Sequence, residues 1–448
     1  MRATTRPLDP DVDLNDVAAG DGYLFVRDGV GIAGRGVAAR IPLARVAEAL
    51  AAIDHIDSVG DVHPIAIGSI PFEPGAPCDL VIPQVVVGKA ADGRRWVTTI
   101  DDASFELPAT RPEPKAQAFS VAPLTDVAHY LTAVATARDA VRAGVLTKAV
   151  IAREVLVTSP EPIDVHAVLR RLKASFGSSY RYSVDGFIGA SPELLIAVEG
   201  NTVRCHPLAG TTPRTGDPET DRQAAAELLA SEKNQIEHRV VIDMIHDTLL
   251  PWCSYLDWQP EPSIVSVANV QHLGTALEGQ LSDPRPHVLD LVRALSPTPA
   301  LGGFPRDEAL ALIAKAEGFT RGHYGGAVGW VDAVGDGTWA VAIRCAELSD
   351  DRKQARLVAG GGIFSFLPQS STLRQDQFEQ LFGTPHGTDI VSVARAHGLG
   401  AVAATTADEL LAALADPATA VVCVRSDRAS NVLTHERLNA AVSAALAR

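Results

Sequence analysis

Two charged side chains stand where their neighbours in the sequence are small or apolar. Glu193 lies in GASPELL. A carboxyl group in such surroundings is expected to have a raised pKa and to be able to act as a general acid. The alternative is a turn carboxylate that follows Pro192. Lys148 opens the strand-like stretch KAVIAREV after Gly144. It is either a solvated residue at a strand start or a functional group.

Three more polar side chains lie in stretches that are predicted to be strands with apolar neighbours. They are His272 in VQHLGT, Tyr324 in RGHYGG and Arg344 in AIRCAEL. A buried arginine needs an anionic partner. For Arg344 that partner is either a substrate carboxylate or the carboxylate of an internal ion pair.

A tight turn is predicted at Ala209, Gly210 and Thr211, within HPLAGTTPRTG. Backbone N–H groups that are freed in such a turn can bind a carboxylate, although most turns of this composition are only turns.

The helical stretch SEKNQIEHRV places Lys233 and Glu237 four residues apart. The simplest interpretation is a salt bridge worth about 0.3–0.5 kcal/mol. Glu237 and His238 are consecutive and point roughly 100° apart on a helix, so they cannot easily bind one metal ion together. A zinc site of the HEXXH type is therefore excluded here. A single glutamate can still serve Mg²⁺, which keeps several waters and needs only one or two carboxylates.

The elements that must position these residues change in character along the chain. Residues 1–115 alternate short β-like runs with Gly/Pro turns, and ATRPEPKAQA is a predicted linker. From residue 120 the pattern predicts a helix over 121–144, a strand from Lys148, a helix over 162–176 and one long helix from Glu219 to Leu250. Long strands follow, and TWAVAIRCAELS is predicted as one of them. DAVGDGTW and SDDRKQ resemble hairpin connections. We therefore predict an α+β domain with largely antiparallel sheets.

A different pattern begins after about residue 365. TLRQDQFEQLF, DIVSVARAHG, ADELLAALA and ERLNAAVSAALAR are predicted helices, and TAVVCVRSD is a continuous apolar strand. Such units are typical of a parallel α/β layer, here too short to be a complete domain of that class.

Composition limits the function. The chain of 448 residues has a formal net charge of −15, which argues against nucleic acid as a partner, because a phosphate backbone requires a basic surface. An anionic small molecule can still bind through a few arginine or backbone N–H groups. Five scattered cysteines without a CxxC motif argue against a disulfide framework and against a structural zinc site. No apolar run approaches the roughly 20 residues of a membrane span, so we expect a cytoplasmic protein without membrane contact.

Residues of about 120–362 resemble the chorismate-utilising enzymes. This family includes isochorismate synthases, salicylate synthases and the first components of anthranilate and aminodeoxychorismate synthases. The resemblance rests on nine motifs in the family's order: KAVIARE, GASPELL, HPLAGT, SEKNQIEHRVVIDMI, VQHLGT, ALSPTPALGGFP, RGHYGGAVGW, AIRCAEL and AGGGI. It implies the chorismate-binding fold that is similar to anthranilate synthase component I. Residues 1–115 fit its variable N-terminal part, and 120–362 its catalytic region.

The motifs are most similar to those of isochorismate synthases. Lys148 stands where enzymes that add water keep a lysine, and Ala209 where aminodeoxychorismate synthases carry a nucleophilic lysine. The resemblance implies a Mg²⁺-dependent conversion of chorismate to isochorismate, for menaquinone or siderophore synthesis. Lys148 would be the base for the attacking water and Glu193 the acid for the leaving hydroxyl. Glu237 would hold Mg²⁺. The implied chorismate contacts are Ala209, Gly210, Thr211, His272, Tyr324, Arg344, Gly360, Gly361 and Gly362.

The family pattern ends at the glycine run. The family continues after AGxGI into a glutamate-rich segment, whose last glutamate is the second protein ligand of Mg²⁺. Here the corresponding positions hold Gln369, Ser371 and Arg374, and Phe378 stands in place of a lysine. This departure implies impaired Mg²⁺ binding.

The remaining residues resemble a second enzyme. Residues 361–448 are similar to the C-terminal end of the thiamine-diphosphate enzyme 2-succinyl-5-enolpyruvyl-6-hydroxy-3-cyclohexene-1-carboxylate synthase. We therefore expect a fusion at GGGI, with a C-terminal fragment over 363–448. One alternative to a working enzyme is an inactive chimera. Another is a partner module whose tail docks onto the thiamine-diphosphate enzyme of menaquinone synthesis.

Overall fold

The computed structural model describes residues 1–107, 117–267 and 270–364, and later in the chain residues 401–404, 406, 409, 412–413 and 421–424. The chain divides into two compact units, Met1–Leu373 and Arg374–Arg448. Most of the predicted linker ATRPEPKAQA and most residues of the predicted C-terminal helices lie outside the described residues.

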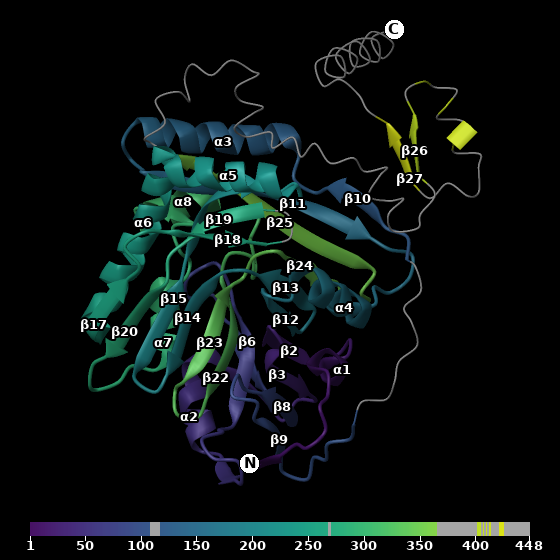
Figure 1. Cartoon of the computed structure of the whole chain (residues 1–448), viewed down its shortest axis with the longest axis vertical. Helices are drawn as coiled ribbons and strands as arrows, with labels where there is room; N and C mark the ends of the chain where they lie inside the picture. The colour runs from purple at the N-terminus through teal and green to yellow at the C-terminus, as the bar shows by residue number, and fades with distance from the viewer. Residues whose placement is uncertain are drawn as a thin grey trace. The chain divides into compact units, whose positions relative to one another are not determined.

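The larger sheet of the first unit has 13 strands (Figure 1). The short strand β21 (Gly303–Phe304) pairs only with β11. The other strands lie in the order β10 (Ser120–Pro123), β11 (Lys148–Thr158), β25 (Gln354–Phe364), β24 (Cys345–Leu348), β13 (Phe187–Ser191), β12 (Tyr180–Val184), β2 (Tyr23–Arg27), β3 (Val30–Arg35), β8 (Val85–Lys89), β9 (Arg95–Ile100), β1 (Arg2–Pro7) and β5 (Asp54–Asp57).

The second large sheet has nine strands, and a third sheet has three. The nine lie in the order β17 (Cys253–Trp258), β20 (Leu277–Leu281), β15 (Thr202–His206), β14 (Leu194–Glu199), β23 (Gly337–Val341), β22 (Ala327–Asp332), β6 (Ile65–Ile70), β7 (Asp79–Ile82) and β4 (Ala39–Pro42). The three are β16 (Leu208–Pro213), β19 (Val270–Gly274) and β18 (Ser263–Ser266). Among the described pairs of these three sheets only β1–β5 is parallel, so the predicted α+β class with largely antiparallel sheets is confirmed.

Helices cover the sheets. Helices α3 and α8 pack together on β11, and α4 packs on β12 and β13 (Figure 1). The helices are α1 (Leu14–Ala18), α2 (Val46–Ala51), α3 (Val127–Arg142), α4 (Val165–Phe176), α5 (Pro218–Ala230), α6 (Glu232–Leu249), α7 (Val288–Leu295) and α8 (Arg306–Ala316).

The first two helices of the catalytic region end close to the predicted positions but begin later than predicted. Helix α3 begins at Val127 instead of residue 121, because Ser120–Pro123 form strand β10, and α4 begins at Val165 instead of residue 162. The Asp126 side chain accepts hydrogen bonds from the N–H groups of Ala128 and His129 at the start of α3. Gly144, with φ of 74°, follows its end. Asp164 caps α4 by accepting from the N–H of Ala167. An N-cap carboxylate satisfies backbone donors that have no partner inside the helix.

The predicted single helix from Glu219 to Leu250 is wrong. The structure has two helices, α5 and α6, that are separated at Ser231. Ser231 has extended backbone (φ −75°, ψ 106°), and its side chain accepts from the N–H of Asn234. Serine favours this N-cap conformation over the helix interior, which gives α6 a direction independent of α5.

Three further local predictions are wrong. TWAVAIRCAELS is not one strand: β23 belongs to the nine-stranded sheet and β24 to the larger one, with Arg344 between them at φ 55°. Tyr324 lies in a turn before β22 instead of in a strand. The predicted turn at 209–211 lies within β16, where the pairing with β19 shifts register and Gly210 has φ 76°. A glycine accommodates this irregularity without steric cost.

The N-terminal residues are integral to both large sheets. β2 pairs with β12 in one, and β6 pairs with β22 in the other. The largest buried cluster contains residues from both parts, among them Leu50, Ile196 and Trp339.

In the second unit, β26 (Ala401–Ala404) and β27 (Val421–Val424) form a parallel pair. The predicted apolar strand TAVVCVRSD is confirmed at its centre, as β27. Within the described residues, no helix is both long and apolar enough to cross a membrane.

Candidate active site

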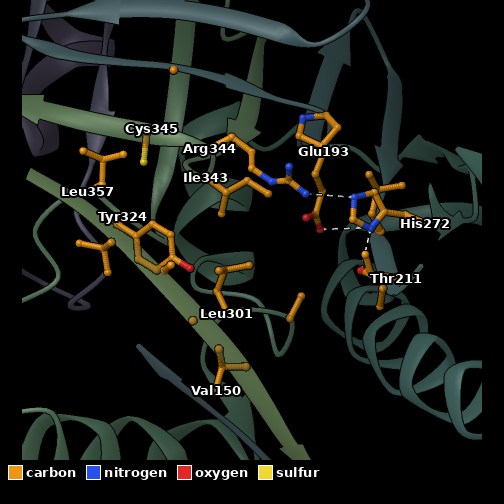
Figure 2. A pocket seen from close by; sticks show the side chains of 18 of the residues that line it. Val150, Glu193, Thr211, His272, Leu301, Tyr324, Ile343, Arg344, Cys345 and Leu357 are labelled. Carbon is orange, nitrogen blue, oxygen red and sulfur yellow. Dashed lines mark hydrogen bonds between the residues drawn. The ribbon is translucent and has the colours of Figure 1, made fainter. Parts of the chain in front are cut away.

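One cavity of about 690 Å³ collects most of the residues that the sequence singled out. This volume is typical of small-molecule sites. Ten of the twelve predicted residues line it: Lys148, Glu193, Ala209, Gly210, Thr211, Glu237, His272, Tyr324, Arg344 and Gly360. Figure 2 shows Glu193, Arg344, His272 and Thr211 on one side, opposite Tyr324 and Val150.

The cavity lies where the chain passes from one sheet to another. Pro192 and Glu193 join β13 of the larger sheet to β14 of the nine-stranded sheet. The segment that contains Arg344 makes the reverse passage, from β23 to β24. Side chains at such passages lie outside the alternation of a regular strand, so they can point into the space between the sheets.

Lys148 is the first residue of β11 and is only 2% exposed. Its Nζ lies 3.6 Å from Oε1 of Glu237. Burial lowers the pKa of Lys148, because an ammonium ion loses its hydration, while the charges of Glu237 and Glu193 oppose this shift. The alternative of a solvated residue at a strand start is wrong.

Glu193 is 3% exposed. The N–H of Leu208 donates to its Oε1 over 3.4 Å, and the N–H of Val341 donates to its backbone carbonyl over 3.1 Å. Burial raises the pKa of Glu193 to about 8, although the hydrogen bond from Leu208 and the charge of Lys148 favour the anion. The carboxyl group thus carries a proton at neutral pH, as its sequence context predicts.

Glu237 reaches the cavity from α6, in the second turn after the cap at Ser231. Its side chain is 17% exposed, so it retains contact with water. His238 points elsewhere: its Nε2 lies 2.8 Å from the Thr275 hydroxyl. Within the part of the chain that the structure describes, no cluster of three His, Cys, Asp or Glu residues could hold a metal ion.

A chain of polar contacts joins Arg344 to Thr211 (Figure 2). Nη2 of Arg344 lies 3.4 Å from Nε2 of His272, and Nδ1 of His272 lies 2.9 Å from the Thr211 hydroxyl. A guanidinium only donates, so Nε2 accepts and the ring proton resides on Nδ1. Burial, assisted by the charge of Arg344, lowers the pKa of His272 to about 4 and keeps the ring neutral.

The guanidinium of Arg344 has His272 as a neighbour, and within the described residues no carboxylate forms a salt bridge with it. Burial lowers its pKa but leaves an arginine charged. A positive charge held in this way suits an incoming anion.

The glycine run contributes to the cavity through Gly360. A Cβ at Gly360 would lie 3.3 Å from the Tyr324 hydroxyl. Burial raises the pKa of Tyr324 to about 12, so its phenol stays protonated. Successive strand residues face opposite sides, and a Cβ at Gly361 would instead lie 3.6 Å from the Tyr130 hydroxyl on α3. Gly362 pairs with Val150 in the ladder.

A buried ion pair beside the cavity was missed at the level of sequence. Glu317 and Arg321 are 2% and 1% exposed and bond each other, with Nε to Oε2 at 2.9 Å. Arg321 also donates to the carbonyls of Val150 (2.6 Å) and Leu301 (2.7 Å). The N–H of Ala152 donates to Glu317 over 2.7 Å. The pair therefore fixes the strand that carries Lys148. Its spacing of four residues was the available signal.

Comparison with known proteins identifies the family. A family model described as "Chorismate binding enzyme" matches residues 78–366. A Mycobacterium tuberculosis (strain H37Rv) protein that bears the name isochorismate synthase MenF is 42% identical over 313 residues, which cover 67% of this chain and 80% of that protein. Isochorismate synthase DhbC of Bacillus subtilis is 36% identical over 333 residues, covering 71% and 79%.

The fold is similar to that of a solved enzyme. The structure of MenF, the menaquinone-specific isochorismate synthase from Escherichia coli, matches with a TM-score of 0.70 over 81% of this chain and 89% of that one. At 23% identity this match concerns the fold alone.

The chain belongs to the chorismate binding enzymes, since the family model matches more than half of it. Within that family, similar relatives at 34–42% identity bear the name isochorismate synthase. The enzyme family that the motifs predicted is therefore confirmed.

Proposed function

We propose that this chain converts chorismate to isochorismate in a Mg²⁺-dependent reaction, with Lys148 as base and Glu193 as acid. One observation carries the proposal. Two buried groups of opposite type line the same cavity, and burial shifts the pKa of each toward neutrality, down for Lys148 and up for Glu193. A pair of groups with such shifts suits proton transfer in both directions at one pH.

The proposed reaction transfers one proton to Lys148 and one proton from Glu193. Neutral Lys148 removes a proton from a water molecule as its oxygen forms a bond to C2 of the chorismate ring. The ring double bonds shift, the C4–oxygen bond breaks, and Glu193 gives its proton to the departing hydroxyl, which leaves as water. Both groups are withdrawn from bulk solvent, with Lys148 2% and Glu193 3% exposed.

The proposed chorismate contacts divide by chemistry. Arg344, Tyr324 and the backbone of Gly360, Gly361 and Gly362 would hold the enolpyruvyl carboxylate. Arg344 lines the cavity, and no carboxylate among the described residues forms a salt bridge with it, which supports this assignment. The ring would lie beside His272 and the irregular part of β16, lined by Ala209, Gly210 and Thr211.

The described residues fit a magnesium ion only through Glu237. One partly hydrated carboxylate suffices for Mg²⁺ when waters and a substrate carboxylate complete the coordination shell. Bound there, the ion would neutralise the ring carboxylate of chorismate and fix the ring. The positions that would supply the second ligand, Gln369, Ser371 and Arg374, lie outside the described residues, as does Phe378. We propose that their side chains impair Mg²⁺ binding.

We further propose that residues 363–448 are a C-terminal fragment of the thiamine-diphosphate enzyme named above, fused at GGGI. Three observations support this origin. The family match ends at residue 366, the chain divides into two units near residue 374, and β26 and β27 form a parallel pair. A partner module that docks on that enzyme through the fragment is the second candidate function.

The test is to purify the 448-residue chain and follow chorismate to isochorismate by chromatography while Mg²⁺ is titrated. We expect saturable turnover with kcat/KM at least roughly 100-fold below that of an intact relative, since one carboxylate ligand is worth several kcal/mol of charge stabilisation. Replacing the residues after Ile363 by the family's glutamate-rich segment should restore the rate.

Two results would contradict the proposal. Near-normal turnover of the unmodified chain would show that the metal site is not impaired. Bound chorismate without turnover, in both the unmodified and the restored chain, would favour the inactive chimera.

A further inference from the structure

At a second end of the cavity, the side chains that the structure describes are apolar. The floor of this end is a row of four residues on neighbouring strands of the larger sheet. Val155 on β11 pairs with Leu357 on β25, and Ile188 on β13 pairs with Ala346 on β24. Directly paired residues point to the same face of a sheet, so the four side chains form one apolar surface.

Helix α4 covers this surface. Val168 and Leu172, four residues apart and therefore on one face of the helix, line the cavity together with the row. We call the six residues Val155, Val168, Leu172, Ile188, Ala346 and Leu357 the apolar arm.

The floor of the apolar arm and the end of the cavity that contains Lys148 lie on opposite faces of the same sheet. Lys148 and Val150 point to one face of β11, and Val155, an odd number of residues away, points to the other. One cavity nevertheless contacts all of them. The described pairing of β24 with β25 is limited to Glu347–Arg356 and Leu348–Ala355, and residues of both strands beyond this pairing, such as Cys345 and Val358, line the cavity.

Arg344 stands at the junction of the two ends. It lines the main cavity and also an adjoining cavity of about 170 Å³, which Leu172, Phe176 and Ala190 share. A ligand whose carboxylate binds Arg344 could therefore extend in either of two directions: toward Lys148 and Glu193, or toward the apolar arm.

We propose that the apolar arm is a ligand site for aromatic carboxylates that carry a bulky apolar substituent, with the carboxylate on Arg344 and the substituent between α4 and the sheet. This goes beyond the proposed function, because chorismate, a polar dicarboxylate, has no apolar group to place there. All six described side chains of the apolar arm are apolar, so water within it is easily displaced, and burial of the substituent drives binding.

The test compares biphenyl-4-carboxylate with benzoate by calorimetric titration of the full chain, which requires no turnover. We expect the biphenyl compound to bind with 1:1 stoichiometry and a Kd about 10-fold or more below that of benzoate, from burial of its second ring. Leu172→Lys should abolish most of this preference and leave the Kd of benzoate unchanged. Arg171→Ala, an exposed neighbour on α4, is the matched control and should retain it.

Leu172→Lys could act by disturbing helix α4, so a second variant changes the opposite wall of the arm. Ala346→Leu fills the arm from the floor and should also reduce the preference for the biphenyl compound. Equal affinities of the unmodified chain for the two ligands would overturn the proposal. A preference that survives both Leu172→Lys and Ala346→Leu would do so as well, because the second ring would then lie elsewhere.

Discussion

Two glutamates in one cavity have different surroundings. Glu193 sits at a passage between two sheets, is 3% exposed, and has a pKa raised to about 8. Glu237 extends from a helix, its side chain is 17% exposed, and its Oε1 lies 3.6 Å from Nζ of Lys148. The difference teaches that the local position of a carboxyl group decides its contact with water. The passage between the two sheets withdraws Glu193 from water and raises its pKa, whereas α6 leaves Glu237 partly in contact with water.

The largest expected effect on activity comes from replacing the Glu193 carboxyl group, which lies at the passage between the two sheets. Glu193→Gln preserves the shape and hydrogen-bonding capacity of the side chain but cannot donate a proton as an acid. We expect kcat to fall about 10²–10⁴-fold, the usual contribution of general acid catalysis, with little change in the affinity for chorismate. Steady-state kinetics and calorimetric binding would measure the two quantities. Glu199→Gln, at an exposed position of the following strand, is the control, and an equal loss of activity in both variants would refute the assignment.

The second effect concerns the strand that carries Lys148. Arg321→Met leaves the buried carboxylate of Glu317 without its partner and is expected to lower the free energy of unfolding by about 3–5 kcal/mol. Denaturant unfolding would measure this loss. Arg204→Met removes an exposed ion pair with Glu278 and should cost at most about 1 kcal/mol. The double variant Glu317→Met/Arg321→Met should be more stable than Arg321→Met alone. If it is less stable, the isolated charge is not the cause.

The third prediction distinguishes the roles of Glu193 and Glu237 by the pH dependence of activity. Glu193 must be protonated to act, so activity should decline as the pH rises through about 8. Lys148 must be neutral, so activity should also decline on the acid side. Glu237→Gln removes a charge that favours protonated Lys148, and should move the acid limb of the kcat profile to lower pH. The alkaline limb should stay in place, and a shift of that limb instead would exchange the assigned roles.

The stability of the folded chain should also decrease as the pH rises through the pKa of Glu193. Burial raises the pKa of Glu193 from 4.5 to about 8, so the folded state binds the proton more tightly than the unfolded chain. This contribution to stability is fully present below the unfolded pKa and is lost as the pH rises through the folded pKa. Glu193→Gln lacks this titrating group. Thermal unfolding should therefore show a smaller loss of stability between pH 5 and 8 for Glu193→Gln than for the unmodified chain.

The smallest effect lies at the start of the helix that presents Glu237. Ser231→Ala removes the side-chain cap of α6 and is expected to cost about 1 kcal/mol of stability. Ser231→Gly should cost only a few tenths of this. Chemical denaturation of the two variants provides the comparison. Equal stability of Ser231→Ala and the unmodified chain would mean that the break between α5 and α6 depends on packing alone.

Much of this arrangement follows from local sequence, and the exceptions have physical causes. Ten of the predicted residues meet in one cavity because short motifs specify the backbone around them. The break at Ser231 was missed because a helical apolar pattern continues across it. The passage at Arg344 was missed because apolar residues on both sides read as one strand. The Glu317–Arg321 pair depends on contacts with Val150, Ala152 and Leu301, which sequence proximity does not reveal.

The interleaving of N-terminal strands with the catalytic ones governs how the first unit unfolds. β2 pairs with β12 and β6 with β22, so residues 1–100 supply neighbours to strands in the middle of both large sheets. Losing them would strip backbone hydrogen bonds from the interior of each sheet. Residues 1–364 should therefore melt as a single cooperative transition, with tryptophan fluorescence and far-ultraviolet circular dichroism reporting the same midpoint.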